Sequence, residues 1–172
     1  MKVQVMDYDE DWVMRFQLEA KKLKDIFGEE LIEIHHIGST SVPGLRAKPI
    51  VDIMPVVQRI DRVDDYNSQM EMIGYECMGE FGITGRRYFR KGGDNRTHQM
   101  HIFEVGDANV RRHLAFRDYL RMHQEDASRY ASLKTDLAYK FPNDIQSNID
   151  GKDALIKEIE KKALDWYGKR SE

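Results

Sequence analysis

The sequence has few cysteines and prolines and no long apolar run. Its 172 residues include one cysteine, Cys77, and four prolines. A single cysteine excludes an intrachain disulfide framework and a clustered thiolate metal site, which is typical of a reducing cytosol. No stretch approaches the roughly 18 uninterrupted apolar residues of a membrane span, and the first residues lack a run of signal-peptide length. These absences predict a cytoplasmic protein with no membrane segment.

An excess of positive charge is also missing. Lysine and arginine number 27 against 30 aspartates and glutamates, which gives a formal net charge of −3. This balance argues against a nucleic-acid partner, because phosphate backbones select a basic field. The 41% hydrophobic and 33% charged composition is typical of a globular protein. We predict a single domain over residues 1–172; the sequence leaves the oligomeric state open.

Hydrophobic spacing predicts a fold of the α+β class. Apolar residues three and four positions apart predict helices over 10–27, 60–73, 110–120, 130–141 and 155–166. Apolar or alternating segments predict strands over 31–37, 50–57, 75–78, 86–91 and 96–105. A helix and a mixed sheet therefore come first, and a helical C-terminal part begins at about residue 107. Asp150 is a candidate N-cap of the last helix.

A glycine-serine turn followed by a polar loop carries the first candidate site. Residues 36–54 read HIGSTSVPGLRAKPIVDIM. A glycine lets the backbone turn sharply or approach a ligand, and the hydroxyls and amides after it suit phosphate oxygens. Taken alone, this motif also fits a purely structural turn. The candidate phosphate-binding residues are Gly38, Ser39, Thr40, Ser41, Arg46 and Lys48.

Asp52 is the one acid on the predicted strand that follows this turn. Its spacing from Ser39 resembles the nucleotidyltransferase superfamily of the DNA polymerase β type, in which such a strand carries two carboxylates at alternate positions facing the metals. The second position here is Met54, and a thioether is a poor ligand for Mg²⁺. The resemblance therefore implies a depleted metal site on Asp52, for Mg²⁺ or Mn²⁺ with Zn²⁺ as the alternative.

Three ordered motifs narrow the resemblance to one family. The turn segment is followed by THQMHIFEV over residues 97–105 and by RRHLAFRDYLRMH over residues 111–123. Together they resemble the GrpB family of small bacterial proteins, over about residues 31–137. The resemblance implies a nucleotidyltransferase-like fold. The family characteristically carries an apolar residue at the position of the second carboxylate, as this chain does at Met54, so standard transferase chemistry does not follow from the resemblance.

Two histidines on the 97–105 strand are further candidates. Neutral imidazoles bind transition metals and act as acids or bases near pH 7. The three-residue offset of His98 and His101 places them on opposite faces of a regular strand, and His98 shares its face with Glu104. The sequence does not show which face meets Asp52. The resemblance, which centres on the His-Ile-Phe segment, favours His101; His98 and Glu104 are weaker metal-ligand candidates.

The predicted hairpin before this strand is basic. Its cations are either guides for an anionic ligand or charges that keep a sheet edge from pairing with other chains. The sequence leaves both interpretations open. The residues concerned are Arg86, Arg87, Arg90, Lys91 and Arg96.

These features support three hypotheses of function. The first is metal-assisted nucleotidyl or phosphoryl transfer from a nucleotide or other phosphorylated small molecule to an unknown acceptor, with Asp52 and His101 as the catalytic and metal-binding residues. The alternative is a non-catalytic nucleotide- or phosphometabolite-binding module that lost its metal chemistry with the second carboxylate. A third, RNA binding, is weakened by the acidic balance and the lack of an aromatic-basic platform.

Overall fold

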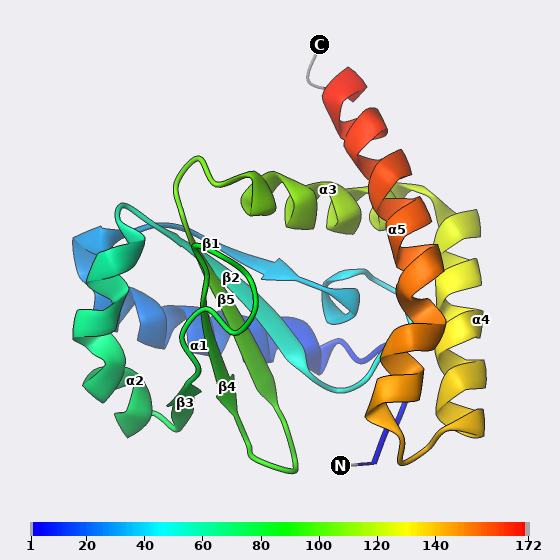
Figure 1. The fold of residues 1–172 in the computed structure, drawn as a ribbon, viewed down its shortest axis with the longest axis horizontal. Coiled ribbons are helices and arrows are strands. Elements are labelled where there is room, and N and C mark those ends of the chain that lie inside the picture. The colour runs from blue at the N-terminus through cyan, green and yellow to red at the C-terminus, as the bar shows by residue number, and fades with distance from the viewer. Residues whose placement is uncertain (1, 171–172) are drawn as a thin grey trace.

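The computed structural model describes residues 2–170 as a five-stranded mixed sheet with helices on both faces and a helical C-terminal part (Figure 1). The strands are β1 (Leu31–Ile37), β2 (Val51–Val57), β3 (Tyr75–Cys77), β4 (Arg87–Lys91) and β5 (His98–Glu104). The helices are α1 (Asp11–Phe27), α2 (Asn67–Met72), α3 (Ala108–Met122), α4 (Gln124–Lys140) and α5 (Ile145–Arg170). The sheet order is β1-β2-β5-β4-β3, and β2 and β5 are its parallel pair. The predicted α+β architecture is confirmed.

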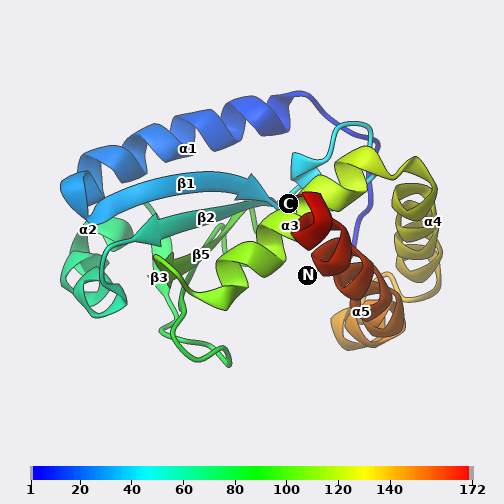
Figure 2. The same ribbon diagram turned by 90° about the horizontal axis from the view of Figure 1, so that it is seen from above.

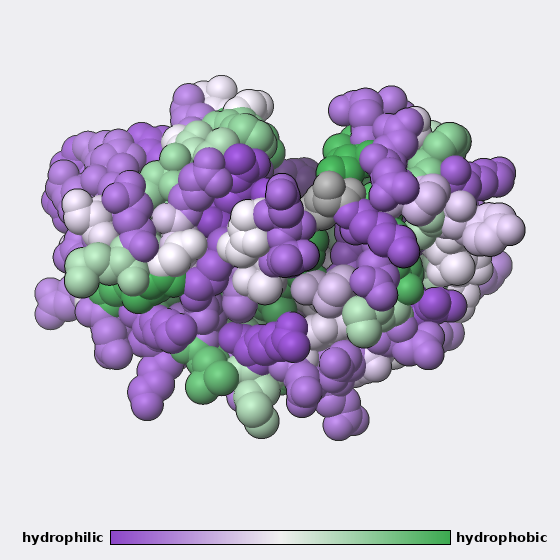
Figure 3. Space-filling view, turned by 90° about the horizontal axis from the view of Figure 1, so that it is seen from below, coloured by the Kyte–Doolittle hydropathy of each residue, from purple (hydrophilic) through white to green (hydrophobic). Residues whose placement is uncertain are grey.

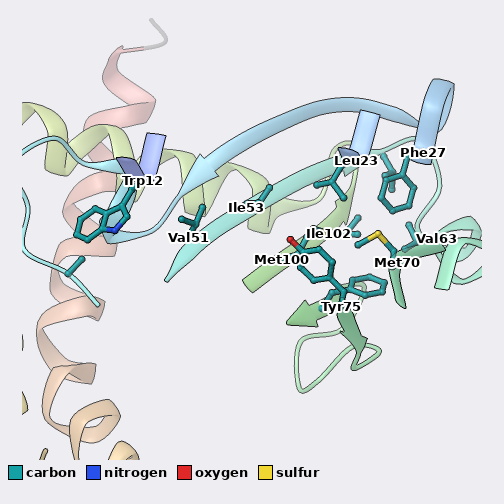
Figure 4. Close-up of a cluster of buried hydrophobic side chains, with 13 residues drawn as sticks. Trp12, Leu23, Phe27, Val51, Ile53, Val63, Met70, Tyr75, Met100 and Ile102 are labelled. Carbon is teal, nitrogen blue, oxygen red and sulfur yellow. The ribbon is translucent and has the colours of Figure 1, made fainter. Parts of the chain in front are cut away.

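Helix α1 closes one face of the sheet. It ends at Phe27, as the spacing predicts, and Gly28 follows with a φ of 54°, which a residue without Cβ adopts readily. Its buried side chains meet the alternate apolar residues of β2 and β5, as Figure 4 shows. Each fully buried side chain of this size contributes roughly 1.5–3 kcal/mol of transfer free energy. The core on this face includes Trp12, Leu23, Phe27, Val51, Ile53, Met100 and Ile102.

Helix α3 covers only part of the opposite face. Ile37, Met54 and Phe103 form a small apolar cluster there, against Val110 and Leu114 of α3. Figure 2 shows the three layers, with α1 on one side of the strands, α3 on the other, and α4 and α5 beside them. The first residues of β2 and β5 therefore face α4 and α5 instead of α3.

The helical part packs around its own apolar cluster. Ala115, Leu120, Ala127, Ile159 and Ala163 come from α3, α4 and α5. The loop after the glycine-serine turn inserts Val42 and Leu45 into the same cluster. The turn is thus held between the sheet and the helical part. Within residues 2–170, no helix is both long and apolar enough to pass through a bilayer.

One local prediction is borne out only in part and another is wrong. Residues 60–73 form a 3₁₀ helix over Ile60–Tyr66 and then the short α2, where the spacing predicts one continuous helix. In the first segment Val63 is buried and Ile60 and Tyr66 are partly buried, so the inward positions recur every third residue, the period of a 3₁₀ helix. Asp150 lies inside α5 and does not cap it. Asp144 takes that place, since its carboxylate accepts from the Ser147 amide at 3.0 Å. The first turn of α5 is polar, so the apolar spacing starts later than the helix.

Candidate functional site

The main cavity lies between the sheet and the helical part. It has a volume of about 630 Å³ and is open where β2 and β5 begin. Figure 3 shows the surface hollowed between these two parts of the molecule. Many of the lining side chains carry a polar or charged group: Ser39, Thr40, Lys48, Asp52, Arg90, Arg96, Gln99, Tyr130, Lys134 and Lys152.

The glycine-serine turn is packed directly onto Asp52. Asp52 is the second residue of β2 and pairs with Ile37 of β1 and Gln99 of β5. Gly38 has a φ of 72°, and a Cβ built on it would lie 2.6 Å from Asp52 Oδ2. Both the backbone conformation and the carboxylate therefore require glycine at this position.

The short 3₁₀ helix Ser39–Ser41 uses most of its own hydroxyl groups internally. Thr40 Oγ1 and His36 Nε2 share a hydrogen bond of 2.9 Å, and the Ser41 hydroxyl donates to the Gly38 carbonyl. Burial lowers the pKa of His36 to about 4, so this imidazole is neutral at pH 7. Ser41 is buried and does not line the main cavity. Ser39 is thus the hydroxyl of the motif best placed for a ligand.

Helix α3 fixes the turn from the other side. Arg117 Nη1 donates to the His36 carbonyl at 3.2 Å, and Arg121 Nη2 donates to the Ser41 carbonyl at 2.8 Å. Charge-assisted hydrogen bonds of this kind are roughly twice as strong as neutral ones. These arginines therefore hold the backbone of the turn and do not line the main cavity.

His101 of β5 contacts the Asp52 carboxylate. Its Nε2 lies 3.1 Å from Asp52 Oδ1, and its Nδ1 lies 3.3 Å from Arg86 Nη1. A guanidinium only donates hydrogen bonds, so Nδ1 must accept and the ring hydrogen must sit on Nε2. His101 therefore donates to the Asp52 carboxylate. In this arrangement the Nε2 lone pair is not available to a metal or a proton.

Arg86 is buried and is the residue that follows His101 in this series of hydrogen bonds. It donates to the Glu80 and Phe81 carbonyls at 3.1 and 2.7 Å, and its guanidinium carbon lies 4.9 Å from the centre of the Tyr88 ring. No carboxylate within the described part of the chain forms an ion pair with it. Its charge thus supports Asp52 through the imidazole of His101. The sequence interpretation of Arg86 as an edge charge or ligand guide missed this role.

The structure places His98 and Glu104 away from Asp52. His98 Nδ1 contacts Thr97 Oγ1 at 2.8 Å on the α1 side of the sheet. Glu104 Oε1 accepts from the Ile60 amide at 3.2 Å, at the far end of β5. His98 and His101 therefore lie on opposite faces of β5, as predicted, and His101 lies on the same face as Asp52.

The position of the missing second carboxylate lies in the core. Met54 is fully buried under α3, beside Ile37 and Phe103. Across residues 2–170, no three His, Cys, Asp or Glu side chains gather as a metal-binding set. A cation bound at Asp52 would have to take its other ligands from water and from the bound molecule.

Arg46 and Lys48, predicted together, point to different places. Arg46 turns to the N-terminal segment, with Nε 3.4 Å from Asp7 Oδ1, and does not line the main cavity. Lys48 does line it, and burial lowers the pKa of its amine while Asp52 opposes that shift. The structure thus places Arg46 outside the lining of the main cavity, next to the β-bridge between Met6 and Ala47.

Two lysines of the helical part complete the cationic lining. Burial, together with Lys152 and Lys48, lowers the pKa of Lys134 to about 7; burial and Lys48 lower that of Lys152 to about 8. Lys134 Nζ donates to the Arg46 carbonyl and lies 4.4 Å from the centre of the Tyr130 ring. Sequence reasoning missed both. The available signal was Lys134 itself, a charge between Tyr130 and Leu137 on the buried stripe of α4.

The basic hairpin divides between the two interpretations. Arg87 pairs with Asp64 at 2.8 Å, and Lys91 pairs with Glu19 at 2.7 Å, away from the main cavity. Arg90 and Arg96 line it. The position of Arg90 follows from the β4–β5 register, which sends alternate residues to the Asp52 face, whereas Arg96 lies in the turn before β5.

Comparison with known proteins gives the same family as the sequence motifs. Residues 2–162 match the family model described as GrpB protein. The chain belongs to the GrpB family. UPF0157 protein YqkA of Bacillus subtilis (strain 168) is 48% identical over 165 residues, which cover 96% of this chain and 48% of YqkA. The chain thus spans about half the length of that relative.

Solved structures include a member of the same family. The crystal structure of conserved protein GrpB from Enterococcus faecalis matches with a TM-score of 0.93 and 48% identity, over 95% of this chain and 99% of that one. A distant likeness is to the Cid1 poly(U) polymerase, with a TM-score of 0.46 and 11% identity, over 76% of this chain and 44% of that one.

Proposed function

We propose that the main cavity binds a nucleotide or another phosphorylated small molecule and transfers a nucleotidyl or phosphoryl group with the help of a divalent cation. The observation that carries this is the convergence of Lys48, Lys134 and Lys152. Desolvation works against the charged form of all three amines. Within residues 2–170, none of the three has a carboxylate ion-pair partner. A polyanionic ligand supplies the missing counter-charge.

The phosphates would lie between the turn and the helical part. Ser39 offers a hydroxyl from the sheet side, and Lys134 and Lys152 approach from α4 and α5. Tyr130, whose hydroxyl bonds to Ser39, has a pKa raised by burial and therefore stays a neutral donor. The cavity volume of about 630 Å³ is in the range of small-molecule sites.

The residues present fit one hard divalent cation. Mg²⁺ in phosphate sites is held by one or two carboxylates, by phosphate oxygens and by water, so Asp52 alone suffices on the protein side. When bound, such a cation neutralises charge on the phosphates and polarises the reacting phosphorus. Zn²⁺ fits less well, because the Nε2 of His101 carries the hydrogen bonded to Asp52. His101 and Arg86 then act as positioning residues for the carboxylate.

The second candidate function is binding without turnover. Met54 favours it, because the site of a second metal carboxylate is filled by a core side chain. Both candidates place a small phosphorylated molecule in the main cavity and need neither a nucleic acid nor a membrane. Both are compatible with a location in the cytoplasm, because such molecules and Mg²⁺ are plentiful there.

Calorimetry tests the proposal on the wild-type chain with ATP, CTP, GTP and UTP, each with and without MgCl₂. Lys152→Met should weaken binding about tenfold, which corresponds to about 1.4 kcal/mol. Lys161→Met, an exposed lysine on the same helix, is the matched control. Absence of binding to any of the four nucleotides, or equal affinities in the two variants, would overturn the nucleotide site.

Asp52→Asn separates the cation from the phosphates. The variant should lose the gain in affinity that Mg²⁺ gives the wild type, while metal-free binding stays equal or tightens because one negative charge is gone. Release of pyrophosphate or phosphate, abolished in Asp52→Asn, identifies a transferase. Tight binding with no release, and with Mg²⁺ dependence unchanged in Asp52→Asn, identifies the binding module.

A further inference from the structure

A second, smaller cavity adjoins the main one. This side cavity has a volume of about 310 Å³ and lies between the N-terminal segment, α1, the loop before β2 and the β4–β5 turn. It shares the side chains of Lys48, Ile50, Asp94 and Arg96 with the main cavity. The two cavities therefore meet along a common boundary.

The side cavity is cationic. Lys2, Arg15, Lys48 and Arg96 line it, and Asp94 is the acid among its lining residues. None of these four cations forms an ion pair with any carboxylate in the described residues. Opposite charges on a surface usually neutralise one another, so four cations without partners indicate a local affinity for anions.

Arg96 carries an independent sign of a missing ligand. Its Nε is buried and has no hydrogen-bond partner in the structure. A buried charged donor without a partner is unfavourable, because it has lost its hydrogen bonds to water and gained none in the protein. Because Arg96 lines both cavities, the unsatisfied donor lies in the side chain that separates them.

We propose that the side cavity binds the acceptor substrate, a small molecule that carries a carboxylate or a phosphate group. The assignment rests on the proposed transfer function of the main cavity. Arg15 and Lys2 attract the anion, and Lys48 and Arg96 hold it at the boundary with the phosphorylated donor. Placing two reactants side by side in this way converts a bimolecular step into an effectively unimolecular one.

An anionic acceptor also needs no general base at Asp52, where the Nε2 of His101 carries a hydrogen and cannot take a proton. A deprotonated carboxylate or phosphate oxygen forms its bond to the phosphorus of the donor directly. The bond from phosphorus to the leaving phosphate oxygen breaks, and its electron pair remains on the leaving group. No proton changes hands, so the imidazole of His101 can stay bonded to Asp52 throughout.

In the test, the full chain is first saturated with Mg²⁺ and a non-hydrolysable ATP analogue. It is then titrated with inorganic phosphate in one arm and with succinate in the other. Amide chemical shifts follow binding. One further saturable site is expected, and Arg15→Gln should weaken it at least fivefold. Arg15 lines the side cavity but not the main one. The arm with the tighter binding identifies the acceptor group.

Two controls keep the result specific. Lys24→Gln removes one exposed charge from the same helix and should leave the second site unchanged. Lys152→Met should weaken the nucleotide analogue without changing the second site. Equal constants for Arg15→Gln and Lys24→Gln, or no saturable second site, would overturn the acceptor assignment.

Failure of the proposed function has a different signature. The analogue would then not bind to the wild type, whereas phosphate or succinate titrated into the nucleotide-free protein would still be sensitive to Arg15→Gln. If the second anion instead binds only where the analogue is displaced, the side cavity is not a separate subsite and the proposal fails.

Discussion

The two faces of the sheet differ although the same strands make both. On the α1 face, Ile53 and Met100 are fully buried in a continuous core. On the other face, the adjacent residues Asp52 and Gln99 line the main cavity. One step along a strand thus separates a position in the core from a position in the cavity lining. Stability and binding are expected to respond to different mutations.

The largest loss of stability should come from a cavity created in the core between α1 and the sheet. Leu23→Ala removes a fully buried side chain of α1 and should lower the free energy of unfolding by about 2–5 kcal/mol. Urea denaturation measures it. Leu18→Ala, on the exposed side of the same helix, should change stability by no more than about 0.5 kcal/mol. Similar losses in both variants would show that α1 does not close this face.

The next effect tests the contact between the turn and Asp52. Gly38→Ala should cost about 1–3 kcal/mol of stability and abolish ligand binding, because the new Cβ strains the backbone and displaces the carboxylate. Gly44→Ala is the matched control, with a φ of 80° and no neighbour within 4 Å of its Cβ. It should show the backbone cost alone and keep its affinity; equal loss of binding would contradict the contact.

The affinity for nucleotide should fall as pH rises. The lysines with pKa values of about 7 and about 8 lose their protons between about pH 6.5 and 9, and the cavity loses positive charge. We expect about tenfold weaker binding across this range, measured calorimetrically in buffers of equal ionic strength. Lys152→Met should flatten the upper part of the profile and Lys161→Met should not. An identical slope in both would refute the role of Lys152.

The smallest effect should be a gain in stability on the open face. The pKa of Lys134 is lowered in the folded state, so its penalty is full below pH 7 and disappears as pH rises towards the ordinary lysine value. Lys134→Met should therefore stabilise the protein by about 1 kcal/mol at pH 6.5 and by less at pH 9.5. Thermal unfolding beside the exposed control Lys140→Met measures it. A loss of stability at pH 6.5 would mean that the Arg46 carbonyl contact outweighs burial.

The sequence predicts much of this contrast because alternation along β2 and β5 is a local property. The positions of Asp52 and His101 on one face follow from it, once the two strands are known to pair in parallel. The motifs shared with the family also predict the turn at Gly38. Short-range patterns therefore account for most of the sheet and for its side of the cavity.

The remaining part depends on tertiary packing. Lys134 and Lys152 reach the main cavity only because α4 and α5 pack beside the first residues of β2 and β5. Arg46 does not line it, because its side chain lies beside Asp7 of the N-terminal segment, next to the bridge between Met6 and Ala47. The hydrogen of His101 is fixed by Arg86, a contact that no spacing in the sequence encodes.

The order in which the cavity lining is synthesised has a consequence of its own. Strands β1 to β5 leave the ribosome before α4 and α5, so a nascent chain can assemble its sheet while Lys134 and Lys152 are still missing. The complete cavity lining therefore exists only after α4 and α5 have been synthesised and packed beside the sheet.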